Sequence, residues 1–187
     1  MMALFPSTLK LGKRAWETAF ALESGPERKV TLEFVAHRLA EALPIIDTDE
    51  DGKSGLAFTG TPQSISFIAP VSSGPNGGGL YRMAIAVRPA NDNSPTSLEL
   101  RISPFVRGTS GTNAPVAEEA RRLADDLQSL QIRYFGAVSA SEKASWNTEW
   151  SSPSQLPELV EFIIVSRDPE QAVVAPLRVE LRLRTHG

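Results

Sequence analysis

The sequence contains no cysteine and only two histidines, His37 and His186, among its 187 residues. Without cysteine the chain can form no disulfide bond, no thiolate metal site and no cysteine nucleophile. A Ser-His-acid triad would need one of the two histidines, and no G-x-S-x-G segment is present to position the serine. We therefore expect the protein not to be an enzyme.

Strong charge and long apolar runs are also absent. The formal net charge is -3 and the isoelectric point is near 5.5, so the composition predicts no binding to nucleic acid or to an acidic membrane surface. No run approaches the ~20 consecutive apolar residues that a membrane-spanning helix needs. At this length we expect one domain over residues 1–187, with a helical part at 1–43 and a β-rich part at 44–187.

A helix is predicted from Ser24 to Leu43. Ser24 and Glu27 have the spacing of a capping box, and Pro44 favours an end just before it. The apolar residues recur at the spacing of one helix face, which would pack on the strands downstream. They are Leu32, Val35, Ala36, Leu39, Ala42 and Leu43.

A second helical segment is predicted from Ser7 to Glu23, with Leu9, Trp16 and Phe20 on one side. Two interpretations stay open. These side chains pack on the protein's own core, or they form an interface for a partner helix.

Alternating apolar and polar residues predict strands in most of the remaining chain. The predicted strands are 56–59, 64–69, 81–88, 98–103, 130–135, 160–165 and 177–184, whereas 118–127 fits either a short helix or a strand with a turn. A helix followed by consecutive strands predicts an α+β fold, in which the N-terminal helix packs against mostly antiparallel sheet.

An acidic turn is predicted from Asp47 to Gly55. Gly52-Lys53-Ser54 resembles the end of a phosphate-binding loop, but the acids around it would repel phosphate. Asp47, Asp49 and Asp51 match the opening of a calcium loop, although Phe58 stands where that motif has its bidentate glutamate. We favour a plain solvated turn and keep calcium as the alternative; no other cofactor is predicted.

Two tryptophans, Trp146 and Trp150, lie in the polar segment 139–157. We favour burial, in which the segment folds back and both rings plug an open end of the sheet, because tryptophans are usually largely buried. The alternative is a periplasmic β-rich binding module that recognises glycan or protein through these rings.

Several segments, taken in order, are similar to one known family. R-L-A-D-D-L-Q-S-L-Q-I-R-Y-F-G at 122–136 looks like an acidic turn leading into an aromatic strand. W-N-T-E-W at 146–150 is followed by L-P-E-L-V-E-F-I-I at 156–164, and P-L-R-V-E-L-R-L-R at 176–184 looks like a closing strand. F-T-G-T-P-Q-S-I-S-F-I-A-P at 58–70 and the glycine-rich loop before Leu80 also fit. The chain thus resembles the soluble domain of a J-class minor pseudopilin of the bacterial type II secretion system.

This resemblance implies a pilin-like fold and a structural role at the tip of a short periplasmic pseudopilus. The implied partners are minor pseudopilins of the I and K classes, with the helix as the assembly surface and secreted cargo as a further contact. The implied location is the periplasm, on a protein anchored in the bacterial inner membrane.

The family begins with a basic leader, a processing site, a glutamate near the mature start and a membrane-spanning half-helix, which the sequence does not show. We expect either a soluble piece of such a protein or a chain whose start is set too far downstream. Gly25-Pro26 would also interrupt the family's long helix.

Overall fold

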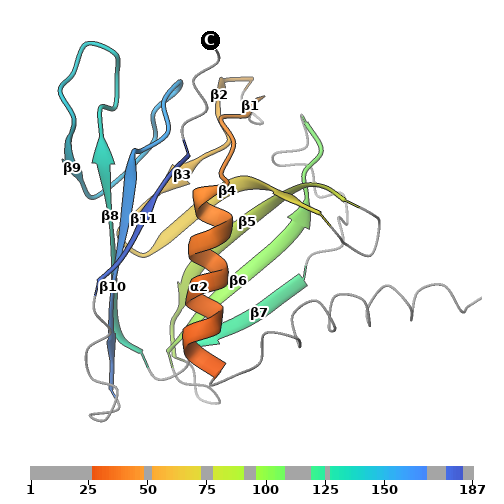
Figure 1. Cartoon of the computed structure of the whole chain (residues 1–187), viewed down its shortest axis with the longest axis vertical. Coiled ribbons are helices and arrows are strands. Elements are labelled where there is room, and N and C mark those ends of the chain that lie inside the picture. The colour runs from red at the N-terminus through yellow and green to blue at the C-terminus, as the bar shows by residue number, and fades with distance from the viewer. Residues whose placement is uncertain are drawn as a thin grey trace, which may run out of the picture.

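The computed structural model describes residues 27–48, 52–72, 78–90, 96–107, 119–124, 127–167 and 176–182. In this part of the chain one helix is followed by strands (Figure 1). The strand pairs among the described residues are all antiparallel, so the predicted α+β class with mostly antiparallel sheets is confirmed. The elements are α2 (Glu27–Ala40), β1 (Ile46–Thr48), β2 (Ser54–Leu56), β3 (Thr59–Gly60), β4 (Ser64–Val71), β5 (Gly79–Arg88), β6 (Ser97–Pro104), β7 (Glu119–Ala124), β8 (Leu127–Gly136), β9 (Ser145–Asn147), β10 (Leu159–Ser166) and β11 (Leu177–Glu180).

The described strands form two larger sheets and a hairpin. The first sheet has the order β3-β4-β5-β6-β7, the second has the order β11-β10-β8-β9, and β1 pairs with β2. Because side chains alternate between the two faces of a strand, each sheet turns one face to the core. Met83 and Ile85 of the first sheet and Tyr134 and Phe162 of the second are at most 2% exposed on these core faces.

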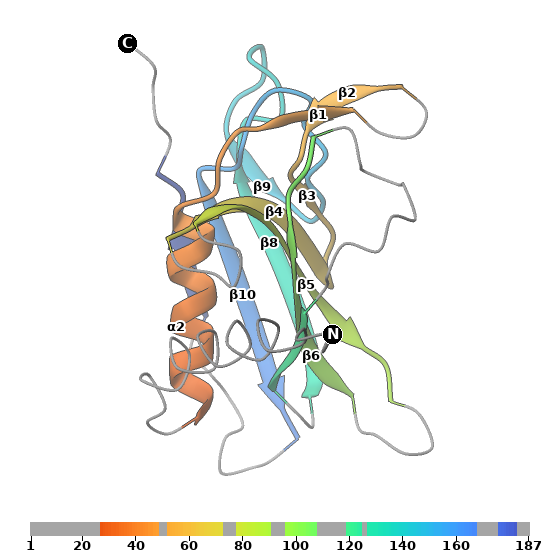
Figure 2. The same cartoon turned by 90° about the vertical axis from the view of Figure 1, so that its right-hand side faces the viewer.

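Helix α2 lies in the angle between the two sheets, where it contacts β4 and β7 of the first and β11 of the second (Figures 1 and 2). Val35 and Leu39 point into the core and are 3% and 0% exposed, as their helical spacing predicted. The backbone of Arg182 donates a hydrogen bond to the carbonyl oxygen of Ala40, at 3.1 Å. This contact ties the end of the helix to the chain just after β11.

The helix ends at Ala40, three residues before the predicted end at Leu43. The N–H groups of Glu41 and Ala42 bond to carbonyl oxygens three residues back, at 3.2 and 3.0 Å, which tightens the chain into a final turn. The N–H of Leu43 then bonds to the Ile68 carbonyl of β4, at 2.9 Å. Residues 24–26 of the predicted helix and the whole helical segment 7–23 lie outside the described residues.

Two strand predictions and the predicted acidic turn need correction or completion. The ambiguous segment 118–127 contains the strand β7. The predicted strand 56–59 is divided, because β2 ends at Leu56 and β3 begins at Thr59. The acidic turn is flanked by a hairpin in which Ile46 of β1 pairs with Leu56 of β2, and residues 49–51 at its tip lie outside the described residues.

The two larger sheets meet at a seam between Gly60 of β3 and Trp150. Their backbones exchange hydrogen bonds of 2.8 and 2.9 Å, and the Trp150 ring lies 6.5 Å from the Tyr134 ring of β8. A Cβ atom on residue 60 would lie 2.2 Å from Cζ of Tyr134, so the seam needs glycine there. At the same place the Trp150 Nε1–H donates to the Gln155 carbonyl oxygen at 2.9 Å.

Candidate functional site

The partner-helix interface predicted at Leu9, Trp16 and Phe20 lies outside the described residues. The outward residues of α2 that can be described are polar. Glu33 is exposed, and His37 is 59% exposed beside Glu41, with 3.6 Å between Nε2 and Oε1. The exposed side chains that can be described on α2 therefore offer no apolar helix–helix contact.

Asp47, the first residue of the predicted acidic calcium set, is buried at 7% exposure. Its Oδ2 accepts a hydrogen bond from the guanidinium of Arg82 on β5, at 3.0 Å, and its Oδ1 accepts the N–H of Thr48, at 3.0 Å. Both carboxylate oxygens thus have protein donors. Asp49 and Asp51 lie outside the described residues, and the described part of the chain contains no cluster of three potential metal ligands. Calcium binding here stays a prediction.

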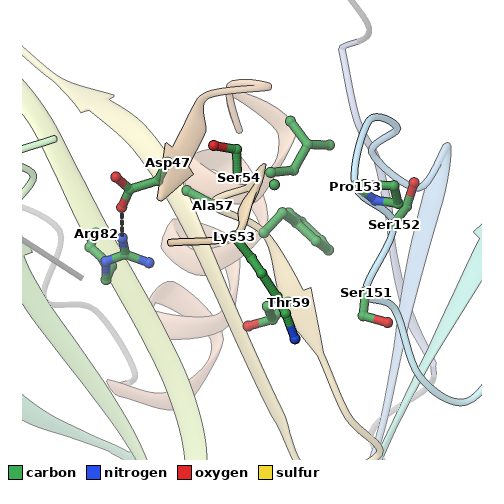
Figure 3. Close-up of a pocket in the computed structure, with 12 residues that line it drawn as sticks. Asp47, Lys53, Ser54, Ala57, Thr59, Arg82, Ser151, Ser152 and Pro153 are labelled. Carbon is green, nitrogen blue, oxygen red and sulfur yellow. Dashed lines mark hydrogen bonds and ion pairs between the residues drawn. The ribbon is translucent and has the colours of Figure 1, made fainter. Parts of the chain in front are cut away.

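A pocket of about 400 Å³ opens beside the hairpin (Figure 3). Asp47 and Arg82 lie on one side of it, and the loop Ser151–Pro153 lies on the other, while Lys53 runs between them toward Thr59. The pocket borders the core, since Leu56, Ala57 and Phe58 of its lining are buried. Arg82 belongs to the outer face of the first sheet, since it neighbours the core residue Met83 on β5.

The lining of this pocket offers several hydroxyl groups and the amine of Lys53. The lining residues include no histidine, and their one acid, Asp47, is paired with Arg82. The Ser152 hydroxyl already donates to the Val138 carbonyl oxygen at 2.7 Å and accepts the N–H of Gln155 at 3.0 Å. The lining therefore contains no Ser-His-acid set.

The two tryptophans of the polar segment have different environments. Trp150 is 1% exposed, so its predicted burial is confirmed, whereas the same prediction is wrong for Trp146, which is 42% exposed. Trp146 lies on the edge strand β9, directly across from Phe135 of β8, with ring centroids 5.4 Å apart. The guanidinium carbon of Arg133 lies 4.9 Å from the centroid of its ring. The Trp146 ring is thus accessible to solvent and packs against Phe135 and Arg133.

A buried glutamate, Glu161, holds Arg133 in place. Glu161 of the central strand β10 is 1% exposed and lies between Arg133 of β8 and Arg178 of β11 in the strand register. Arg133 donates to Glu161 Oε2 through Nε, at 2.9 Å, and also through a terminal nitrogen. Arg178 donates to Oε1 through Nε, at 2.8 Å. Two arginines therefore share one carboxylate.

The environments of two groups shift their pKa values in opposite ways. Burial alone would raise the pKa of Glu161, but the hydrogen bonds and positive charges of Arg133 and Arg178 outweigh it and lower the pKa below 4.5. Burial raises the pKa of Tyr134 well above its usual range, and its hydroxyl lies 2.9 Å from the Thr61 carbonyl oxygen. Glu161 is thus charged and Tyr134 neutral at pH 7.

The sequence reasoning missed the arrangement of Arg133, Glu161 and Arg178. A signal was present, because Glu161 is the one charged residue in the apolar run Leu159–Val165 of a central strand. A buried carboxylate needs a paired charge, and neighbouring strands were predicted to carry arginines in alternation with apolar residues. The sequence alone could not predict the strand register, which places these three residues in one row across the sheet.

Among the residues that the structure describes, none belongs to a helix with the length and hydropathy needed to cross a bilayer. No family model and no curated protein matches the sequence. The structure is similar to a chain of the crystal structure of the GspK-GspI-GspJ complex from the type 2 secretion system of enterotoxigenic Escherichia coli. The TM-score is 0.55 and the sequence identity is 17%, over 94% of this chain and 98% of that chain. This similarity shows a pseudopilin-like fold.

Proposed function

We propose that this chain is a structural, non-enzymatic minor pseudopilin of the J class, which helps to assemble the tip of a type II secretion pseudopilus. The observation that carries the proposal is the shared fold, which extends over 94% of the chain and 98% of a chain in a complex of such proteins. The ordered sequence segments that resemble the J class support the same assignment.

The proposed partners are minor pseudopilins of the I and K classes, the classes present with GspJ in the similar complex. The proposed location is the periplasm, on a protein held at the inner membrane through an N-terminal helix. Contact with secreted cargo belongs to the same proposal.

The described contacts support a structural role. Helix α2 buries Val35 and Leu39 against both sheets, so the two sheets fix the direction of the helix. A rigid support for an assembly helix requires no reacting groups.

The proposal is tested by mixing this chain with soluble I- and K-class domains and measuring the mass by size-exclusion chromatography with light scattering. We expect a stable complex, whereas the chain alone is monomeric or self-associates weakly. Trp16→Asp should weaken the complex, because a charge would be buried unpaired at the interface. Val106→Asp is the matched control, since Val106 is a 53% exposed apolar residue of the first-sheet region.

If the three domains fail to co-migrate at micromolar concentrations, the pseudopilin assignment is wrong even though the fold is shared. If the complex forms and neither variant weakens it, the assignment stands and the interface lies elsewhere than Trp16.

A further inference from the structure

The outer face of the second sheet carries one exposed aromatic ring among polar and charged side chains. Figure 1 shows this sheet nearly edge-on, with α2 on its other side, so the outer face looks away from the helix and the first sheet. Directly paired residues of neighbouring strands share a face, so the strand register defines two rows across it. We call the two rows together the Trp146 surface: Trp146, Phe135, Leu159 and Glu180 in one, and Arg133, Glu161 and Arg178 in the other.

The Trp146 ring is held from one side and open on the other. Its contacts are the Phe135 ring, 5.4 Å away between centroids, and the guanidinium carbon of Arg133, 4.9 Å from its centroid, and both residues belong to β8. Among the described strands β9 is the edge of the second sheet, so no paired strand covers the side of the ring that faces away from β8. The exposed fraction of 42% agrees with an open side. A ring held in this way loses little conformational entropy when a ligand stacks on it.

The far end of the same face presents a hydrogen-bond donor and an acceptor side by side. Arg178 and Glu180 are two residues apart on β11 and both are exposed, so their side chains share one face. Arg178 uses Nε for Glu161, and within the described part of the chain its terminal nitrogens contact no acceptor. The carboxylate of Glu180 has no donor among the described residues. A ligand hydroxyl group can accept from the guanidinium and donate to the carboxylate.

The composition of the Trp146 surface favours a neutral ligand that carries hydroxyl groups. Its two arginines and two glutamates balance, so charge does not select an acidic or a basic partner. Among the residues that the structure describes, Trp146 is the only exposed large apolar side chain of the second sheet, whereas Phe135 and Leu159 beside it are half-buried. One exposed ring offers little apolar core for a protein interface of about 800 Å² per partner. A sugar ring needs no more, since its C–H face stacks on the aromatic ring while its hydroxyl groups bond to polar side chains.

The spacing of the strands sets the length of a ligand that uses both ends. Neighbouring strands lie about 4.8 Å apart, so the three steps from β9 to β11 put about 14 Å between the backbones of Trp146 and Glu180. Phe135 and Leu159 lie between them in the same row. A single sugar ring cannot reach both ends, whereas a short extended chain of rings lying across the strands can.

We propose that the Trp146 surface binds a neutral, extended oligosaccharide of the β-1,4-linked glucose or N-acetylglucosamine type. One sugar ring stacks on the open side of Trp146, and the following rings pass over Phe135 and Leu159. Hydroxyl groups at the far end bond to Arg178 and Glu180. The β-1,4 linkage suits this surface because it keeps the chain extended and gives each ring flat C–H faces. This binding activity goes beyond the secretion role proposed above and does not depend on it.

The test titrates the full chain with cellohexaose and with chitohexaose, the hexamers of β-1,4-linked glucose and N-acetylglucosamine. Isothermal titration calorimetry measures Kd, and nuclear magnetic resonance follows the indole N–H signals of the three tryptophans. We expect at least one oligosaccharide to bind with a Kd of about 1 mM or below. Only the Trp146 signal, identified by its loss in Trp146→Ala, should shift. Because the ligand is neutral, Kd should not change with ionic strength.

Two variants and a control locate the binding. Trp146→Ala should raise Kd by about tenfold or more, because it removes the stacking surface. Glu180→Gln should raise Kd several-fold, and since Glu180 has no contact among the described side chains, a disturbed fold would not explain the loss. The matched control is Glu33→Gln, an exposed acid of α2 on the other side of the second sheet, which should leave Kd unchanged. Thermal melting of each variant checks that it is folded.

Three results would overturn the proposal. Neither oligosaccharide binds at millimolar concentration, or binding survives Trp146→Ala unchanged, or the Trp146 signal shifts with the I- and K-class domains but not with the oligosaccharides. The last result would assign the surface to the pseudopilin interface and leave the proposed function standing. Conversely, a failure of the three domains to associate would not affect the oligosaccharide titration.

Discussion

Aromatic side chains occur on both faces of the second sheet, but they are buried on the core face and partly exposed on the outer face. On the core face, Tyr134 and Phe162 are at most 2% exposed, and Trp150 closes the seam to the first sheet. On the outer face, Trp146 is 42% exposed and rests on an arginine rather than on the core. Within residues 139–157, a tryptophan therefore stabilises the fold only where the first sheet covers its ring.

The largest expected effect is on the core face. Trp150→Ala should lower the free energy of unfolding by about 3–5 kcal/mol, because it removes a fully buried ring and leaves a cavity beside Tyr134. Urea denaturation monitored by circular dichroism measures this change. A loss below about 1 kcal/mol would contradict a structural role for the ring.

A smaller effect is expected at Glu161. Glu161→Gln should cost about 1–3 kcal/mol near neutral pH, because it removes a charged acceptor that serves both Arg133 and Arg178. The folded-state pKa of Glu161 lies below its ordinary value of 4.5, so its stabilisation is fully present above that pH. It is lost as the pH falls through the folded-state pKa.

The stability difference between the parent chain and Glu161→Gln should therefore be constant above about pH 5 and shrink in more acidic solution. Thermal melts across this range measure it. A difference that grows on acidification would show that the carboxylate is not stabilised by its two arginines.

The smallest stability effect is expected on the outer face. Trp146→Ala should cost about 1 kcal/mol or less, since the ring is partly solvated and its deletion leaves no closed cavity. The same denaturation experiment, run beside Trp150→Ala, measures the contrast directly. Equal losses for the two variants would remove the distinction between the faces and restore the original expectation that both rings are structural.

Local periodicity was sufficient to locate most of the regular structure. The 3.6-residue spacing of Val35 and Leu39 predicted the buried face of α2, and the alternation of Met83 and Ile85 predicted the core side of β5. These signals depend only on neighbours in the sequence. Helix ends were less certain, because the final turn at Ala40 is set by hydrogen bonds to β4 and to the chain after β11.

The candidate sites depended on contacts that the sequence does not encode locally. Trp146 and Trp150 lie four residues apart in one polar segment, so composition treats them alike. Only the pairing of β9 with β8 separates them, since it places Trp146 over Phe135 on the solvent side. Similarly, Asp47 matches a calcium-loop ligand in the sequence, and only the structure shows its side-chain contact with Arg82 of β5.

The seam between Gly60 and Trp150 has a consequence for how the chain folds. Its two hydrogen bonds join residues separated by most of the β-rich part, so a long loop must close before either bond can form. The hairpins β4-β5 and β5-β6 need only short loops and can form early. We therefore expect the second sheet to dock on the first late in folding, with the small space above Gly60 filled last by the Tyr134 ring.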